Sequence, residues 1–415
     1  MSKYYEIARE RYEEAGVDAE EAIRKLLGTA ISIHCWQGDD VVGFESKGES
    51  LSGGIQTTGN YPGRARNAAE LMADFDKAAS LIPGTHRINL HASYAVSDGN
   101  SAERDQLKPE HFAKWMDYAK ERGLGIDFNP TFFSHPMVKD NLTLSSPDEE
   151  VRSYWVRHAI ACRRIAGAIA KELQKPALNN IWIPDGYKDA PADRLGPRLR
   201  LKKSLDEIFE EKIEGVIDCV ESKLFGIGLE SFTVGSGEFY LAYASSRPNV
   251  YNLLDSGHYH PTEFISDKIP SLLVYFDKIP LHVTRGMRWD SDHVVLLEDE
   301  LKEIAFEIVR NDALDKVLIG LDFFDASINR IAAWVVGARN MQKALLHAML
   351  NPWKTMKDLQ DSSRFTELMI MREQFKLMPV GAVWEEFCRR NNAPQDGEWF
   401  AQVREYEENV LVKRV

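Results

Sequence analysis

Short runs of β-branched and apolar residues alternate along the chain with longer segments in which apolar residues recur every three or four positions. Such alternation is typical of parallel strands joined by crossover helices. Eight candidate strands can be counted, which is the number that closes a barrel. They are residues 31–36, 87–93, 125–131, 179–184, 224–231, 249–255, 279–285 and 317–323. The pattern predicts an α/β fold of the (β/α)8 TIM-barrel class.

Local signals predict where two of the intervening helices begin. Ser146-Pro147-Asp148-Glu149 places a proline and two acids in a first helical turn, and Ser204-Leu205-Asp206-Glu207 has the spacing of a capping box. Long helices are therefore expected after both. Outside the barrel, predicted for residues 30–340, we expect an N-terminal helical segment at 1–29. A C-terminal helical extension at 341–415 is expected to cover the barrel or bind another subunit.

Composition narrows the class of protein. The chain has 415 residues and is 44% hydrophobic, enough to bury one large core. Its net charge is −13 and it has no long basic run, so no nucleic-acid partner is expected. The first residues are densely charged, and the later apolar run 331–338 is too short to span a bilayer. The four cysteines form no CxxC pair. We expect a cytoplasmic protein without membrane contact.

Acids and histidines gather where four successive predicted strands end. Active sites of (β/α)8 barrels lie at this carboxyl-terminal face. The group consists of Glu230, Asp255, His258, His260, His282, Asp290, Asp292, His293 and Asp322. A single acid at a strand end is more often a helix cap or an ion-pair partner than a metal ligand, but a set of this size has no such structural explanation. The sequence therefore predicts an active site at the later strands.

The charge of this group favours a metal site. Several carboxylates a few ångströms apart repel one another and cannot all remain ionised without cations. Two divalent ions would neutralise them, and a ligand set rich in oxygen with some imidazole suits Mn²⁺, Co²⁺ or Mg²⁺ better than a thiolate zinc site. Manganese is our first choice. The roles of His260 and His293 stay open, since each could support the metal ligands or be structural. Asp325 could be a metal ligand or a helix cap.

Several long segments resemble the L-rhamnose isomerases. They are GIGLESFTVGSGEFY (226–240), LLDSGHYHPTEFISDKIPS (253–271), RWDSDHVVLL (288–297) and GLDFFDASINRIAAWVVGARNM (320–341). INLHASYA (88–95) and NIWIPDGYKD (180–189) fit the same family. The resemblance extends over nearly the whole chain.

The resemblance implies roles for individual residues. The ligands of the family's structural metal match Glu230, Asp255, His282 and Asp322. The ligands of its catalytic metal match His258, Asp290 and Asp292. The sugar-flanking residues of the family fall on Trp36, His91, Phe133 and Trp182. As alternatives, Trp36 or Phe133 could be ordinary core aromatics, and His91 could be a hydrogen-bonded strand-end histidine. The resemblance also implies a homotetramer.

The implied reaction is the interconversion of L-rhamnose and L-rhamnulose, with activity on some related aldoses. The implied catalytic residues are Asp290, Asp292, His258 and His91. Xylose isomerases carry Glu-x-Lys at the fifth strand, whereas Ser231 and Phe232 follow Glu230 here. A lysine that polarises the carbonyl is therefore predicted to be absent, and a metal-assisted hydride shift from C2 to C1 is expected.

Other functions stay open at this point. A barrel metallohydrolase would fit the metals, although many place His-x-His at the first strand, where this chain has His34-Cys35-Trp36. Another sugar isomerase or epimerase is a second alternative. A metal-dependent endonuclease of the same fold disagrees with the charge of −13.

Overall fold

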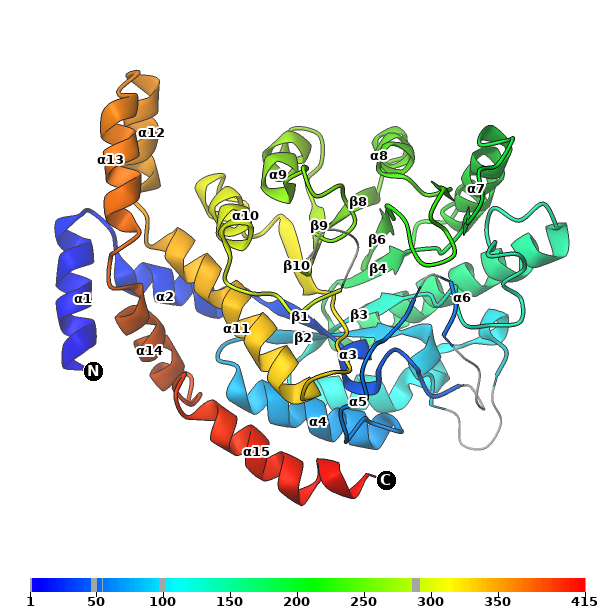
Figure 1. The fold of residues 1–415 in the computed structure, drawn as a ribbon, viewed down its shortest axis with the longest axis horizontal. Coiled ribbons are helices and arrows are strands. Elements are labelled where there is room, and N and C mark those ends of the chain that lie inside the picture. The colour runs from blue at the N-terminus through cyan, green and yellow to red at the C-terminus, as the bar shows by residue number, and fades with distance from the viewer. Residues whose placement is uncertain (1, 46–50, 54, 97–101, 286–291, 415) are drawn as a thin grey trace.

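The computed structural model describes residues 2–45, 51–53, 55–96, 102–285 and 292–414. Within them, eight parallel strands close into a barrel in the order β1-β10-β9-β8-β6-β4-β3-β2 (Figure 1). The strands are β1 Ile31–His34, β2 His86–His91, β3 Gly125–Asn129, β4 Ala177–Ile181, β6 Val216–Glu221, β8 Val250–Asp255, β9 Ile279–Val283 and β10 Val317–Leu321. The predicted (β/α)8 fold is confirmed.

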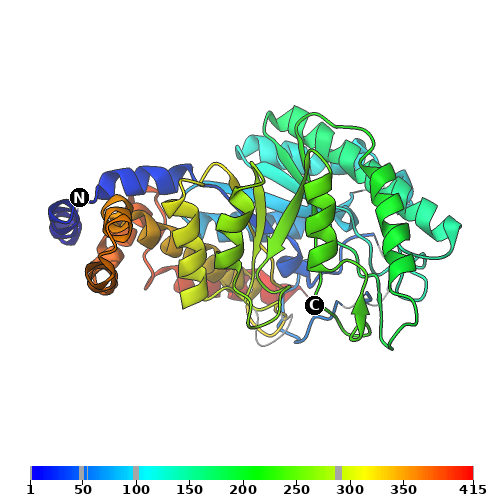
Figure 2. The same ribbon diagram turned by 90° about the horizontal axis from the view of Figure 1, so that it is seen from above.

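Helices follow each strand and surround the barrel, as the view from above also shows (Figure 2). They are α4 Ala68–Leu81, α5 Ala113–Glu121, α6 Glu149–Leu173, α7 Leu195–Ile208, α8 Gly237–Ser246, α9 Ile265–Leu273, α10 Asp299–Arg310 and α11 Arg330–Met349. A short helix, α3 Trp36–Asp39, follows β1, and a small antiparallel pair joins β5 Gly186–Tyr187 to β7 Phe232–Thr233. Side chains on both faces of a parallel strand are covered in this architecture, which explains why β1, β3, β4 and β9 are buried throughout.

The strand register brings the carboxyl ends of the strands to one edge. His91 at the end of β2 lies opposite Asn129 at the end of β3. On the far side of the barrel, Asp255 at the end of β8 lies opposite His282 in β9. Polar side chains that are distant in the sequence therefore meet at one mouth of the barrel.

Seven of the eight predicted strands agree with the structure, and the fifth was wrong. The fifth barrel strand is β6, Val216–Glu221, whereas residues 224–231 form turns and irregular chain that lead to β7. The error began with the predicted capping box, because Ser204 lies inside α7 and donates its hydroxyl to Leu144 O at 2.8 Å. Because α7 already ends at Ile208, the fifth strand begins earlier than it could if a helix started at Ser204. The other predicted helix start is confirmed by Asp148, which caps α6.

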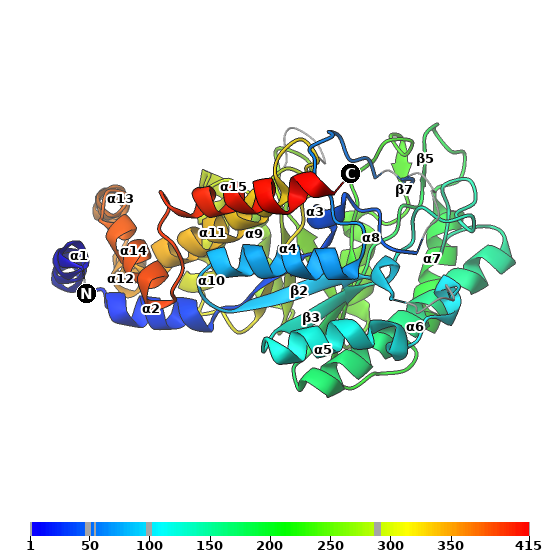
Figure 3. The ribbon, with the colours of Figure 1, turned by 90° about the horizontal axis from the view of Figure 1, so that it is seen from below.

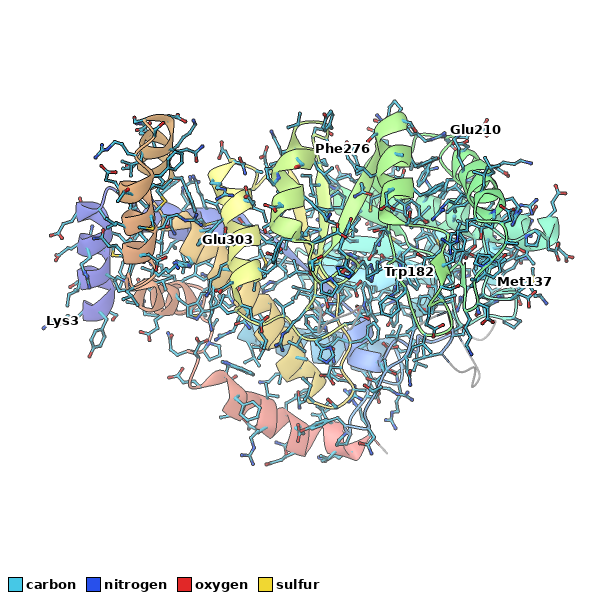
Figure 4. The ribbon with its side chains drawn as sticks, turned by 45° about the horizontal axis from the view of Figure 1, so that its top comes forward. Lys3, Met137, Trp182, Glu210, Phe276 and Glu303 are labelled. Atoms are coloured by element: carbon cyan, nitrogen blue, oxygen red, sulfur yellow. The ribbon has the colours of Figure 1, made fainter. Side chains whose placement is uncertain are left out.

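Further helices flank the barrel at both ends of the chain. They are α1 Lys3–Glu14 and α2 Ala19–Gly28 before β1, and α12 Trp353–Asp361, α13 Phe365–Phe375, α14 Val380–Arg390 and α15 Trp399–Asn409 after α11. The expected boundary at residue 340 falls inside α11, which is the last helix of the barrel. α1 packs on α14, and Arg390 forms an ion pair with Glu20 at 2.6 Å. Lys3 on α1 and Met137 lie at opposite ends of the molecule (Figure 4).

The segment after α14 returns to the barrel. α15 lies beside α11, and the chain that follows it ends near α3 and α4 (Figure 3). Arg414 donates to both carboxylate oxygens of Asp74 on α4, at 2.6 and 2.7 Å. Among the helices of the described residues, none is both long and apolar enough to span a membrane.

Candidate metal and sugar site

Four side chains at or next to the ends of β6, β8, β9 and β10 point at one another, and three of them are buried. They are Glu221, Asp255, His282 and Asp322, and each offers a ligand atom within 4.8 Å of the others. His282 Nδ1 lies at the centre, 3.5 Å from a Glu221 oxygen, 3.8 Å from an Asp255 oxygen and 3.3 Å from an Asp322 oxygen. Three carboxylates therefore share a single imidazole.

Glu221 stands at the end of the fifth strand, the position predicted for Glu230. The predicted fifth strand was misplaced, so the acid expected at its end lies outside the clustered group. Glu230 is exposed, and its carboxylate accepts a hydrogen bond from Gly228 N of its own loop at 2.8 Å. The sequence did contain a signal, because residues 216–220 are mostly β-branched or apolar and Glu221 follows them directly.

The charges within this group shift its pKa values. Burial, together with repulsion from Glu221 and Asp322, raises the pKa of Asp255 to about 7 against the attraction of His258. Burial acts against ionisation of Glu221 too, but the attraction of His282 outweighs it and holds the pKa of Glu221 well below its usual range. Burial alone would lower the pKa of His282, whereas Glu221 and Asp322 raise it well above the ordinary value. These carboxylates therefore favour the protonated form of His282.

The group fits a divalent cation. One oxygen of each carboxylate is held by the protein: Asn180 donates to Glu221, Gly257 N donates to Asp255 at 2.7 Å, and Trp36 Nε1 donates to Asp322 at 2.8 Å. By contrast, Asp255 Oδ2 and both ring nitrogens of His282 have no hydrogen-bond partner among the described residues, although all three are buried. Partners of this kind orient metal ligands in proteins and leave the other atoms for the ion.

Aromatic side chains form the opposite wall of the site. Rings from the ends of β1 to β4 contact one another in sequence: Trp36 and His91 at 4.7 Å between centroids, His91 and Phe133 at 5.5 Å, and Phe133 and Trp182 at 5.9 Å. Figure 4 shows Trp182 in the interior part of the molecule. The structure therefore brings together all four of the predicted sugar-flanking residues.

The two walls enclose a cavity of about 330 Å³, which Trp36, His91, Phe133, Trp182, Glu221, His258, His282 and Asp322 all help to line. Its size and its mixture of aromatic walls and a few polar groups are typical of sites for small ligands. Burial lowers the pKa of His91 to about 4, so this imidazole is neutral near pH 7. The cavity thus faces an acidic metal-binding wall on one side and an uncharged aromatic wall on the other.

A lysine lines the cavity beside Glu221, contrary to the sequence prediction. The fifth strand ends in Glu221-Ser222-Lys223, which is the Glu-x-Lys pattern that the misplaced strand had hidden. Lys223 is buried, and its Nζ lies 5.2 Å from the centroid of the Trp182 ring. The lysine cation is therefore placed between the acidic wall and the aromatic wall.

Comparison with known proteins shows the family of the chain. Residues 1–414 match the family described as L-rhamnose isomerase (RhaA). The L-rhamnose isomerases of Salmonella typhi and Salmonella gallinarum are each 54% identical to the chain over 416 residues, covering 100% of this chain and 99% of the relative. The chain belongs to the L-rhamnose isomerase family.

Among solved structures, an L-ribulose 3-epimerase (TM-score 0.48, 12% identity) is similar over 77% of this chain and 95% of its own. A D-psicose 3-epimerase from Clostridium cellulolyticum H10 (TM-score 0.47, 14% identity) covers 77% and 98%.

The second metal position expected of an L-rhamnose isomerase is described in part. His258 follows β8 and its Nδ1 lies 3.1 Å from a Glu221 oxygen, and Asp292 lines the same cavity. Asp290 lies outside the described residues. His258 and Asp292 are thus close to the four-ligand group, and a second ion bound by them stays a prediction.

The three residues left open by the sequence have different surroundings in this family member. His260 is exposed, and its ring contacts Thr262 Oγ1 at 2.8 Å. His293 is exposed at the rim of the cavity, and its backbone pairs with Arg285. Asp325 accepts from Ser327 N at 2.8 Å and from its hydroxyl at 2.5 Å, which stabilises a turn before α11, whose N-cap is Asn329. None of these three belongs to the four-ligand group found among the described residues.

Proposed function

We propose that the protein is an aldose-ketose isomerase that interconverts L-rhamnose and L-rhamnulose. Membership of the L-rhamnose isomerase family over residues 1–414 carries this proposal. The site supports it chemically, since a cavity with one acidic wall and one aromatic wall suits a polyhydroxylated ligand that has both polar and apolar faces. Related aldoses with the same arrangement of hydroxyls are expected to react more slowly.

We infer two divalent ions, with manganese as the first choice. Glu221, Asp255, His282 and Asp322 would hold the first, and His258, Asp292 and Asp290 the second. Bound ions of this kind polarise the sugar oxygens and favour the ionised form of a coordinated hydroxyl. The oxygen-rich set suits Mn²⁺, Co²⁺ or Mg²⁺.

The remaining residues of the cavity would bind and orient the sugar. Lys223 offers an ammonium group that can stabilise negative charge developing on the carbonyl oxygen. Trp36, Phe133 and Trp182 would pack on the apolar face of the sugar and exclude bulk water. The Trp182 indole N–H is buried without a partner among the described residues, so a sugar hydroxyl can accept from it.

These assignments favour a hydride shift from C2 to C1 over proton transfer. A general base works best when its pKa is near the operating pH, whereas the pKa of His91 is lowered to about 4. Apart from His293 and Asp325, the other acids and imidazoles that line the cavity are proposed metal ligands, whose lone pairs would be engaged. Reaction in D₂O should leave little deuterium at C1 of the ketose, and near-stoichiometric deuterium in early product would contradict the hydride shift.

Turnover of L-rhamnose tests the proposed function directly. Purified protein should form L-rhamnulose, lose that activity when its metal is removed with EDTA, and regain it with Mn²⁺ better than with Ca²⁺, whose larger radius fits this site poorly. Full activity in excess chelator would exclude the metal assignment. Absence of ketose from L-rhamnose, with hydrolysis of another substrate, would favour a barrel metallohydrolase.

We further propose a cytoplasmic homotetramer, as the family resemblance implies. Light scattering from purified protein should give a mass of about four times the 47.2 kDa chain. A monomer would contradict this assignment without affecting the proposed chemistry.

A further inference from the structure

Arg330, at the start of α11, connects two segments that contribute to the cavity wall. Its side chain is 5% exposed. Two of its nitrogens donate to the two oxygens of Asp40, each at 2.8 Å, while a third donates to Tyr61 O at 2.9 Å and Pro62 O at 3.2 Å. The planar guanidinium has donors for all four contacts, which a lysine ammonium with three donors cannot reproduce.

The first of these segments is a turn in an unfavourable conformation. Asp40 and Val41 have φ values of 60° and 62°. For a β-branched residue such as Val41 this region is strained, and it persists only where the surroundings hold it. Val41 is buried and lines the cavity. The Arg330–Asp40 ion pair therefore holds the turn that places one part of the cavity wall.

The second segment, residues 55–65, forms another part of the wall. Ile55, Gln56 and Thr58 line the cavity. Tyr61 N donates to Ala326 O at 2.8 Å. At Gly59 (φ +123°) a Cβ atom would lie 2.3 Å from the Ala326 carbonyl carbon, so the two backbones touch where only glycine fits. This segment is thus fixed against the loop that follows Asp322.

The third connection comes from the C-terminal helix. Glu407 on α15 accepts from Tyr61 Oη at 2.9 Å, and Asn329 donates to the same carboxylate oxygen. Asn329 in turn caps α11 by accepting from Ala332 N at 2.9 Å. Figure 3 shows α15 running beside α11 toward α3. Glu407 and Arg330 therefore hold Tyr61 from its side chain and from its backbone.

We propose that Arg330 and Glu407 are positioning residues that fix the cavity wall formed by Val41 and residues 55–61, and that the C-terminal helix thereby determines how tightly the sugar binds. This inference rests on the proposed function for its substrate, but its structural part does not. Neither residue lines the cavity, so both act through the segments that they hold.

The variant Arg330→Lys tests this role, with Arg339→Lys as a matched control. Arg339 is also buried on α11 and donates to two backbone carbonyls, Leu81 O and Pro394 O, and to Asp396, but it lies outside the cavity lining. In Arg330→Lys, KM for L-rhamnose should rise about tenfold while kcat changes less than about threefold, because a binding wall is lost and not a reacting group. Arg339→Lys should lower the melting temperature without changing KM.

A second pair of variants keeps the test informative if Arg330→Lys folds poorly. Glu407→Ala should raise KM as well, whereas Glu407→Gln retains an oxygen that accepts from Tyr61 and should restore KM to within about twofold of wild type. Hydrogen exchange gives a readout that needs no turnover. The amides of residues 55–65 should exchange faster in Arg330→Lys and Glu407→Ala, and at the wild-type rate in Arg339→Lys and Glu407→Gln.

The results separate this inference from the proposed function. Wild-type KM and wild-type exchange of residues 55–65 in both Arg330→Lys and Glu407→Ala would overturn the positioning role. Changes in KM and in hydrogen exchange of the same size in Arg339→Lys would also overturn it. If the wild-type protein does not isomerise L-rhamnose, the proposed function fails, and hydrogen exchange alone still decides whether these residues fix the wall.

Discussion

Strand β6 carries two buried carboxylates whose surroundings differ sharply. Asp218 is held by Arg163 on α6, with nitrogen–oxygen distances of 3.0 and 2.8 Å, and by Asn179 Nδ2 at 3.0 Å. Glu221, at the end of the same strand, shares His282 with two further carboxylates. A guanidinium thus neutralises Asp218, whereas the centre of the three-carboxylate group at the mouth of the barrel holds the imidazole of His282.

A second structural carboxylate repeats the arrangement of Asp218. Asp127 on β3 is held by Arg87 at 2.7 and 2.9 Å and by Ser32 Oγ at 2.6 Å. Burial would raise the pKa of Asp127, but the neighbouring Arg87 outweighs it and lowers the pKa. Asp255 at the mouth has the opposite shift, because burial and its acidic neighbours raise its pKa. This difference supports the proposal that the group at the mouth binds a divalent cation.

The largest expected effect comes from neutralising Glu221. Glu221→Gln should lose the metal held by the four-ligand group and lower kcat by about a thousandfold or more, since the ion stabilises charge in the transition state. Glu230→Gln is the matched control and should stay within about twofold of wild type, because Glu230 is exposed in a loop. Metal content and turnover are measured on both proteins, and the reverse pattern would restore Glu230 as the ligand.

Removing the partner of Asp218 should affect stability and not metal binding. Arg163→Met leaves Asp218 buried without its cation, which is expected to lower the free energy of unfolding by about 3 kcal/mol or more. Urea denaturation measures the change, and exposed Arg164→Met serves as the control. Added Mn²⁺ should not restore the loss. If it did, the distinction between the two groups of carboxylates would not hold.

The lysine at the boundary of the two walls should matter for catalysis. Lys223→Met is expected to lower kcat about a hundredfold, because a cation facing the developing charge is removed. Metal stoichiometry should be unchanged, and exposed Lys188→Met should behave as wild type. If Lys223→Met kept the wild-type kcat, Lys223 would not stabilise the developing charge, and that role would remain with the proposed metal ions.

Asp39 is a buried carboxylate held by neutral donors, and the smallest effect is expected there. It accepts from Tyr94 Oη at 2.7 Å and Gly43 N at 2.6 Å, and burial raises its pKa to about 7. An aspartate in the unfolded chain has a pKa of about 3.9. The stabilisation that protonated Asp39 contributes to the fold is therefore fully present below that pH and is lost as the pH rises to about 7. Relative to Asp39→Asn, the wild-type free energy of unfolding should fall by about 2 kcal/mol between pH 5 and pH 8.

Exposed Asp267→Asn is the control for this pH dependence and should parallel wild type across the range. Denaturation curves at each pH provide the comparison. A difference between wild type and Asp39→Asn that does not change with pH would show that Asp39 does not titrate in this interval.

Much of the barrel could be predicted from local pattern alone. The buried strand Ile279–Val283 is apolar except for His282, and apolar residues in Gly125–Asn129 alternate with Asp127 and Asn129, so both positions were clear. Asp255, His282 and Asp322 followed from the ends of correctly placed strands. The sugar-flanking residues came from the family resemblance, and the structure places them together.

The fifth strand shows why local pattern fails where tertiary contacts decide. Ser204 has the sequence of a helix cap, but its hydroxyl bonds to Leu144 O in the chain between β3 and α6, a contact that no local pattern encodes. Misplacing the helix start moved the predicted strand past Glu221 and Lys223, and two residues of the candidate site were missed together. The ring of contacts around Arg330 was also missed, because its partners are more than 260 positions away in the sequence.

The position of α15 has a consequence for how the protein is made. Residues 399–414 follow every barrel strand in the chain, so a ribosome synthesises all four residues of the metal-binding group before Glu407 and Arg414 emerge. The nascent barrel can therefore fold and bring the four side chains together before Glu407 and Arg414 make the contacts that hold this part of the molecule, including residues 55–61. The last part of the site to be completed during synthesis is then the part that recognises the sugar. A product truncated before α15 would resemble the enzyme in fold and differ from it in affinity.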